Sequence, residues 1–296
     1  MESGHHILEF TEKLPGKEQS NDQERNSRIV NSAISYLAAY VIVYVFFHLV
    51  TALVAKKQML FNKFYYFKVD FSQDYNSWML EPVRYTFLSG TLFCLALGFI
   101  SLSIQRFYRK RPGMMKLFLL WLGIHSLNFF CTELALLPIK TSGESKMYVS
   151  YLRVFFDYMF WDSILLQISA SIAAFLILIV IGAVTAKNFI QLSNSTQHVY
   201  KAENRFYYLF QMVFIPFAAG SVISLVFFAD APFVLNITTV FTMFVIVVSL
   251  FINGLKNRMI MIYRLPETGQ IDNKFLMVLV GALIILKIFL NDGIKF

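Results

Sequence analysis

Residues 157–186 read DYMFWDSILLQISASIAAFLILIVIGAVTA, and after Asp162 they contain no charged side chain. A helix rises about 1.5 Å per residue, so about 20 apolar residues cross the roughly 30 Å hydrocarbon core of a bilayer. A helix on the surface of a soluble domain would instead carry polar residues along one face. This stretch therefore predicts a transmembrane helix, and it sets the fold class of the chain.

Apolar stretches of similar length recur along the rest of the sequence. They cover residues 31–54, 84–105, 116–138, 206–228, 233–255 and 274–291. None shows the two-residue alternation of outer-membrane strands, so helices are indicated. The sequence predicts an all-α, polytopic transmembrane helix bundle of about seven spans. Residues 1–28 are expected to be a flexible tail, and residues 29–296 the transmembrane domain.

The composition agrees with a membrane protein. Hydrophobic residues make up 57% of the 296 residues and charged residues 15%, whereas soluble domains have about 45–50% and about 25%. Cys94 and Cys131 lie inside apolar stretches and are interpreted as small buried hydrophobic residues. These features exclude a soluble cytoplasmic enzyme, a disordered chain and a disulfide-stabilised secreted domain.

The net charge of +8 is explained by basic residues in cytoplasmic loops, so no nucleic-acid partner is expected. With the N-terminal tail inside, 16 of the 26 basic residues fall on the cytoplasmic side: Lys13, Lys17, Arg25, Arg28, Arg106, Arg109, Lys110, Arg111, Lys116, Lys187, Lys201, Arg205, Lys256, Arg258, Arg264 and Lys274. The N-terminus is therefore expected in the cytoplasm and the C-terminus outside. The short loops suggest the cytoplasmic (inner) membrane of a bacterium.

The largest predicted outer connection is the loop at residues 55–83. It interleaves aromatic residues with lysines, namely Phe61, Phe64, Tyr65, Tyr66, Phe67, Phe71, Tyr75 and Trp78 with Lys56, Lys57, Lys63 and Lys68. Such residues favour the head-group zone of a bilayer, so the loop is expected to lie on the outer membrane face. Binding of a membrane-protein partner through this loop is the alternative.

Ionisable residues within the spans are the candidates for a functional site, because they are costly in hydrocarbon and usually face the protein interior. His48, Glu133, Asp162 and Lys287 share one predicted depth near the outer side. We expect Lys287 and either Glu133 or Asp162 to face an outward-open polar cavity, where a ligand or ion binds.

His125, Asn128 and Thr132 occur at spacings that place them on one face of the third span. Hydrogen bonding to a neighbouring helix is the simpler interpretation of this stripe. A proton or ion path is the functional alternative, and His125 and Asn128 are therefore included among the cavity residues.

The inventory of motifs argues against known intramembrane chemistry. There is no HExxH sequence, no paired-acid pattern of an intramembrane aspartyl protease, and no Gly-rich phosphate loop, so no nucleotide and no cofactor is expected. The Gly90 and Gly220 segments are interpreted as sites of close helix packing. Lys287 lies too near the end of the last span for a retinal Schiff base.

The sequence thus favours a non-enzymatic integral membrane protein, either a subunit of an envelope assembly or a small transporter-like protein. The alternative is an intramembrane metal-dependent hydrolase that uses His48, Glu133 and Asp162, because these side chains are legitimate metal ligands. Whether a metal binds is left open at this stage.

Overall fold

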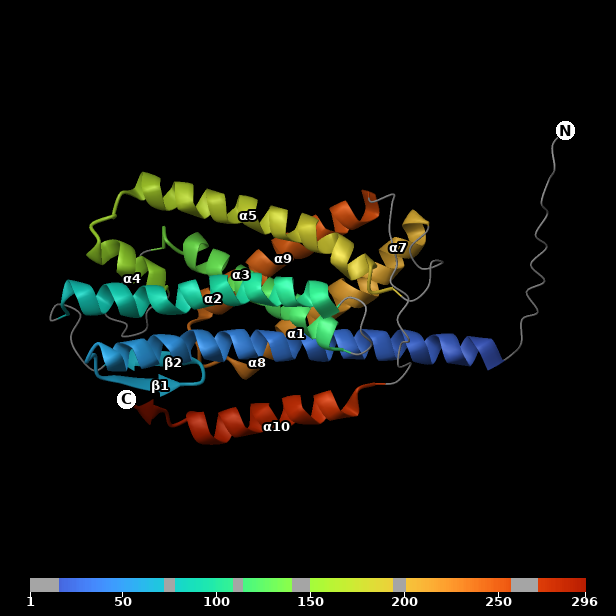
Figure 1. Ribbon diagram of the computed structural model, residues 1–296, viewed down its shortest axis with the longest axis horizontal. Helices are drawn as coiled ribbons and strands as arrows, with labels where there is room; N and C mark the ends of the chain where they lie inside the picture. Colours follow the sequence, from blue (N-terminus) through green and yellow to red (C-terminus); the bar gives the residue numbers. More distant parts are fainter. Residues whose placement is uncertain (1–15, 72–77, 109–113, 140–149, 194–200, 257–270) are drawn as a thin grey trace.

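The computed structural model describes residues 16–71, 78–108, 114–139, 150–193, 201–256 and 271–296. Within these residues, seven helices are long and apolar enough to cross a membrane. They run along the long axis of the molecule, with the start of α1 and the C-terminus at opposite ends (Figure 1). The predicted all-α, multi-pass fold is confirmed.

The elements follow one another along the chain in this order: α1 (Gly16–Lys57), β1 (Asn62–Tyr65), β2 (Lys68–Phe71), α2 (Leu80–Tyr108), α3 (Met115–Ala135), α4 (Tyr151–Tyr158), α5 (Ile164–Ile190), α7 (Ala202–Leu209), a π-helical turn (Phe210–Phe214), α8 (Ile215–Phe227), α9 (Phe233–Lys256), α10 (Asn273–Leu290) and β3 (Ile294–Lys295). α7, the π-turn and α8 together form the fifth span.

The predicted fourth span begins too early. Residues 151–158 form the separate helix α4, and α5 begins only at Ile164. Phe160 adopts a positive φ of 57°, which ends helical geometry between the two. The apolar residues around this break gave the segment the appearance of a continuous span in the sequence.

Helix α1 begins within the segment predicted as a tail. Residues 1–15 lie outside the described part of the chain, but α1 already begins at Gly16. Residues 16–28 contain good helix formers such as Lys, Glu, Gln and Arg. Extending an existing helix by such residues costs little free energy. The extension needs no apolar face, so the hydropathy pattern does not reveal it.

Pro216 has the local effect expected of proline inside a span. It lies at the start of α8, directly after the π-helical turn Phe210–Phe214. Proline lacks a backbone donor and crowds the preceding turn, so widening that turn accommodates it.

Two of the predicted outer segments combine into a small sheet. β1 pairs with β2 as a hairpin and, on its other side, with β3 from the end of the chain. Tyr44 of α1 donates a hydrogen bond to the carbonyl of Phe67 (3.3 Å) and fixes the hairpin on the bundle. The end of the bundle that holds β1, β2 and α4 is called the hairpin end.

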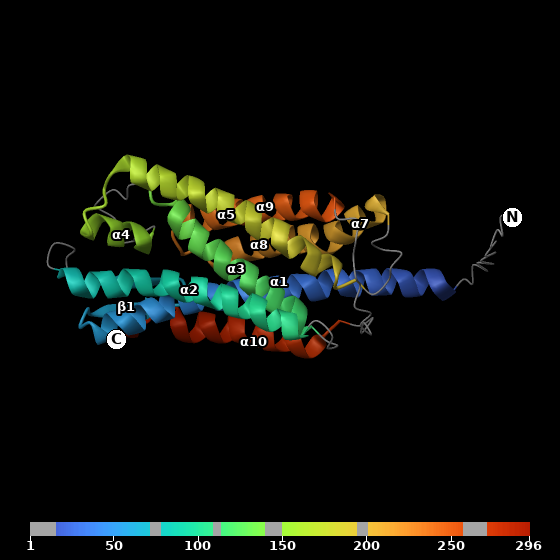
Figure 2. The same cartoon turned by 45° about the horizontal axis from the view of Figure 1, so that its top comes forward.

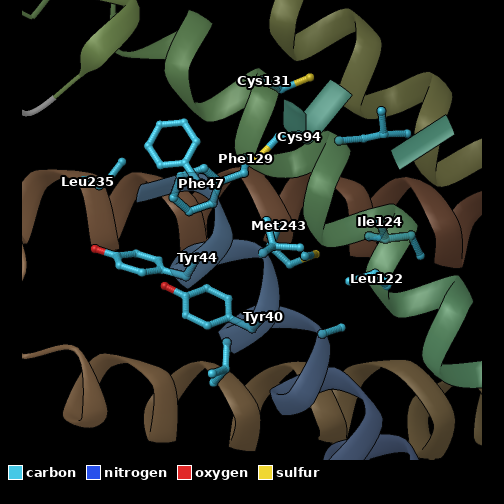
Figure 3. Close-up of a cluster of buried hydrophobic side chains, with 14 of the residues drawn as sticks. Tyr40, Tyr44, Phe47, Cys94, Leu122, Ile124, Phe129, Cys131, Leu235 and Met243 are labelled. Carbon is cyan, nitrogen blue, oxygen red and sulfur yellow. The ribbon is translucent and has the colours of Figure 1, made fainter. Parts of the chain in front are cut away.

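α3 is the central helix and packs against α1, α2, α5 and α9 (Figure 2). Figure 3 shows Phe129 and Ile124 of α3 gathered with Tyr44 of α1 and Met243 of α9 in the hydrophobic core. In contrast, α5 and α10 expose apolar side chains such as Leu176, Val180 and Ile285, which places them against lipid.

Glycines allow close helix contacts at the positions expected from the sequence. A β-carbon at Gly220 would come within 2.6 Å of Cε1 in the Tyr36 ring, and one at Gly90 within 2.9 Å of the Phe47 carbonyl oxygen. Tyr36 is almost fully buried, so its ring has little room to move. The expected packing role of both glycines is confirmed.

Substituting Gly220 by alanine should therefore destabilise the bundle. Overpacking a filled site costs about 1–3 kcal/mol, so we expect Gly220→Ala to lower the thermal unfolding midpoint of the purified chain. Gly281→Ala is the matched control, because no atom lies within 4 Å of the added methyl group there. The control should be neutral or slightly stabilising. Equal midpoints for the two variants would contradict the packing account.

Candidate functional site

A polar centre lies inside the hairpin end, and α4 organises it. We define it by the following residues: His48, Glu133, Ser150, Tyr151, Arg153, Asp157 and Gln167. They come from α1, α3, α4 with its N-cap, and α5. All except Asp157 are buried. Buried polar side chains at membrane depth require partners, and the bonds that they make define the site.

Glu133 binds the N-terminus of α4. Its Oε2 atom accepts hydrogen bonds from Ser150 Oγ (3.0 Å) and from the backbone N–H of Leu152 (2.9 Å). Ser150 is itself the N-cap, since its Oγ atom accepts from the backbone N–H of Arg153 (3.1 Å). The first amides of a helix lack intrahelical partners and attract negative charge, so this is a favourable place for a carboxylate.

His48 contacts the same helix from α1. Its Nδ1 atom lies 3.1 Å from the hydroxyl of Tyr151. Within the described residues, Nε2 of His48 and Nε2 of Gln167 are buried and have no hydrogen-bond partner. Most buried polar atoms are satisfied, so these two mark positions where a further polar group would be favoured.

Arg153 is compensated locally. Its guanidinium group forms an ion pair with Asp157 one turn further along α4 (2.9 Å). It also donates to the carbonyl of Leu137 (2.6 Å) and to the side chain of Gln167. The charge of Arg153 is therefore balanced by Asp157, whereas the donors that Glu133 meets within the described part of the chain, Ser150 Oγ and the Leu152 amide, are uncharged.

An aromatic row on α1 leads from the middle of the bundle to the polar centre. It consists of Tyr36, Tyr40, Tyr44 and His48, spaced four residues apart on one helix face. The ring centroids of Tyr40 and Tyr44 lie 5.8 Å apart, and those of Tyr44 and His48 lie 5.0 Å apart. Tyr40 and Tyr44 project to the same side of α1 (Figure 3).

His125 lies beside the end of this row that is farther from α4. Its ring is 4.3 Å from that of Tyr36 and 5.5 Å from that of Tyr40. Its Nε2 atom is buried without a hydrogen-bond partner among the described residues. His125 thus packs against the aromatic row from α3, and its Nε2 atom bonds to no neighbouring helix within the described residues.

Asn128 and Thr132 behave as the simpler interpretation of the stripe expects. Asn128 Nδ2 donates to the carbonyl of Thr239 on α9 (3.0 Å), and the hydroxyl of Thr132 meets that of Thr242 (2.8 Å). These bonds join α3 to α9, which is a packing role.

The other two predicted cavity residues are not brought to the polar centre. Asp162 is exposed in the link between α4 and α5. Lys287 is exposed on α10, with its Nζ atom 5.9 Å from the ring centroid of Phe227. Neither Glu133 nor Asp162 forms an ion pair with Lys287, so the expected pairing is not made. The lysine stem is long enough to reach the head-group zone instead.

The ligand set proposed for a metal hydrolase does not assemble. His48 and Glu133 lie near α4, but Asp162 is outside the site. Among the described residues, no three His, Cys, Asp or Glu side chains lie close enough to hold a metal ion.

Sequence reasoning missed Ser150, Tyr151 and Arg153. The span predicted at residues 157–186 joins the end of α4 to α5, so the hydropathy pattern does not reveal this short helix. Two signals were present: a serine three residues before Arg153, typical of an N-cap, and the four-residue spacing of Arg153 and Asp157.

Comparison of the chain with protein-family models, with curated proteins and with solved structures finds no match.

The bond between His48 and Tyr151 can be tested with a double-mutant cycle. His48→Phe and Tyr151→Phe each leave one buried polar group without its partner, which costs about 1–3 kcal/mol. The double variant removes both groups. Its loss of unfolding free energy should therefore be smaller than the sum of the losses in the two single variants by about 0.5–1.5 kcal/mol.

Tyr208→Phe combined with Tyr151→Phe provides a control cycle, because Tyr208 binds the carbonyl of Phe189 instead. This cycle should be additive. Additivity in the His48 cycle as well would show that the hydroxyl and the imidazole do not interact.

Proposed function

We propose that this chain is a non-enzymatic, transporter-like membrane protein whose polar centre binds a monovalent cation or a proton. The single observation that carries the proposal is the environment of Glu133. This side chain is 1% exposed, and it accepts hydrogen bonds from the neutral Ser150 hydroxyl and Leu152 amide.

The charges around Glu133 explain why a positive ligand is favoured. The polar centre contains one arginine, Arg153, and its charge is balanced by Asp157. A buried carboxylate without a counter-charge is expensive in a bilayer. A proton or a small cation supplies the missing positive charge, whereas an anion would add to the excess of negative charge at Glu133.

The aromatic row supports movement of the ligand beyond the polar centre. Tyrosine hydroxyls and imidazole nitrogens can both donate and accept hydrogen bonds. Tyr40, Tyr44 and His48 therefore offer polar atoms between His125 and α4.

The proposal places the hairpin end outside the cell and the start of α1 in the cytoplasm of a bacterium. The support is the excess of basic residues in the N-terminal tail and in the loops predicted to lie on the same side of the membrane. The polar centre would then receive its ligand from the outside. A topology reporter fused after Phe296 should report the exterior, and a cytoplasmic signal would reverse the direction.

Flux into proteoliposomes tests the proposal. Purified chain is reconstituted, a membrane potential is imposed, and Na⁺, K⁺ and H⁺ entry are followed with ion-sensitive dyes. We expect faster entry of at least one of these ions than in protein-free vesicles. Glu133→Gln, which removes the charge, should reduce this entry by about tenfold or more, a loss equivalent to about 1.4 kcal/mol.

Glu81→Gln is the matched control. Glu81 is an exposed glutamate at the start of α2, so the same chemical change there should leave flux unchanged. Entry of all three ions at the protein-free rate, or equal flux for wild type and Glu133→Gln, would contradict the proposal.

A subunit of an envelope assembly is the second candidate, favoured by α10. Only Leu279 of this helix is buried, so most of its surface faces outward and is available to another membrane protein. Co-purification of one fixed partner at equal stoichiometry would favour this function, and a lone chain in mild detergent would argue against it.

A further inference from the structure

One surface at the hairpin end is rich in lysine. It is formed by residues 56–57, 62–71 and 287–296, which contain six lysines and two aspartates: Lys56, Lys57, Lys63, Lys68, Lys287, Lys295, Asp70 and Asp292. Asp70 forms an ion pair with Lys68 (2.9 Å). The six lysines, called the lysine patch, therefore leave this surface with an excess of positive charge.

Two of these lysines are placed directly opposite each other by strand pairing. β1 and β3 are antiparallel, with Lys63 opposite Lys295 and Phe64 opposite Ile294. Phe64 is buried against the bundle, so Lys63 and Lys295 lie on the outward face of the sheet. Like charges opposite each other destabilise a sheet, and the carboxylate of Asp70, which lies opposite Lys63 on the β2 side, is paired with Lys68. An anion between the two ammonium groups would replace this repulsion by attraction.

Gly293 makes the pairing sterically feasible. Its φ is +70°, and a β-carbon there would lie 2.8 Å from Cε1 of Tyr65 and 3.0 Å from Cε of Lys63. Only glycine adopts this conformation so close to another strand without strain. The turn from α10 into β3 thus brings Lys295 back to Lys63 from more than two hundred residues away.

The surroundings of the patch fit the head-group zone of a bilayer. Lys63 and Lys68 each lie 5.0 Å from the ring centroid of Tyr65, and Lys56 lies 5.4 Å from that of Phe296. Two further side chains, Met59 and Phe61, are 83% and 64% exposed beside these lysines. Aromatic rings, lysines and exposed apolar groups together are typical of the membrane interface.

The end of α10 indicates the depth of the small sheet in the bilayer. Ile288 and Phe289 are 66% and 70% exposed, which suits contact with acyl chains, and β3 begins four residues after Leu290. The sheet therefore lies where hydrocarbon gives way to head groups. The anion that reaches Lys63 and Lys295 at this level is a lipid phosphate.

We propose that the lysine patch binds the phosphate of an anionic phospholipid, with Lys63 and Lys295 on either side of it. This inference is independent of the proposed cation binding. The patch would anchor the hairpin and the end of α10 to the same leaflet.

The test uses the full chain in nanodiscs of phosphatidylcholine with increasing fractions of phosphatidylglycerol. The variant Lys63→Gln/Lys295→Gln is compared with wild type by thermal unfolding and by native mass spectrometry of retained phosphatidylglycerol. Lys256→Gln/Lys274→Gln is the matched control, since both of its lysines are exposed and belong to the predicted cytoplasmic side. Inorganic phosphate added to pure phosphatidylcholine discs is a separate arm.

We expect phosphatidylglycerol to raise the unfolding midpoint of wild type and of the control. The affinity of the Lys63/Lys295 variant for phosphatidylglycerol should fall about 30-fold. Each lysine near an anionic surface contributes about fivefold, and the two contributions multiply. In pure phosphatidylcholine the same variant should unfold at or above the wild-type midpoint, because the repulsion is gone. Inorganic phosphate should not reproduce the lipid effect.

Equal retention of phosphatidylglycerol by wild type and the Lys63/Lys295 variant would overturn the proposal. So would an equal loss in the control pair, because that result would indicate unspecific attraction between lysines and lipid. A protein partner lost from the Lys63/Lys295 variant, with lipid retention unchanged, would assign the patch to protein binding instead.

Discussion

The hydrogen bonds from Ser150 and Leu152 to the Glu133 carboxylate are the constraint on which the hairpin end depends. A carboxylate inside a transmembrane bundle is tolerated only where donors surround it. The N-terminus of α4 supplies these donors, and in return α4 is held in a fixed position against α3. Its orientation then decides where Tyr151 and Arg153 lie, and so determines which residues of α1 and α5 they meet.

The same arrangement separates structural from functional polar groups. Asn128 and Thr132 bind Thr239 and Thr242 of α9, which explains them as packing residues, although Oδ1 of Asn128 has no hydrogen-bond partner among the described residues. Glu133 differs from them, because its donors Ser150 and Leu152 are uncharged and leave its charge unbalanced. His48 and His125, like Asn128, each keep a buried polar atom without a hydrogen-bond partner among the described residues. Incomplete satisfaction of this kind costs stability, and its occurrence on α1 and α3, which pack against each other, is the physical reason for assigning a ligand to this site.

The sequence predicted the spans well, because twenty apolar residues in a row have few other solutions. The predicted starts and ends of the spans differ most from those of the helices where hydropathy is uninformative. Residues 16–28 are polar yet helical. Phe160 interrupts an apolar run through its backbone conformation. For the site, burial of His48, His125, Asn128 and Glu133 followed from the cost of polar groups in hydrocarbon. The positions of Asp162 and Lys287 did not, because depth along a helix says nothing about the direction in which a side chain points. The role of α4 depends on contacts between residues distant in sequence, and no local pattern encodes them.

The central claim is that Glu133 holds α4 in place, and hydrogen–deuterium exchange of the reconstituted chain tests it most directly. Glu133→Leu removes the acceptor while retaining similar volume. A lost hydrogen bond to a charged group is worth about 1.5–3 kcal/mol, so the amides of residues 152–158 should exchange about 10- to 150-fold faster in the variant. The amides of α9 should exchange at wild-type rates. Unchanged protection of residues 152–158 would show that α4 is positioned without Glu133 and would contradict this account.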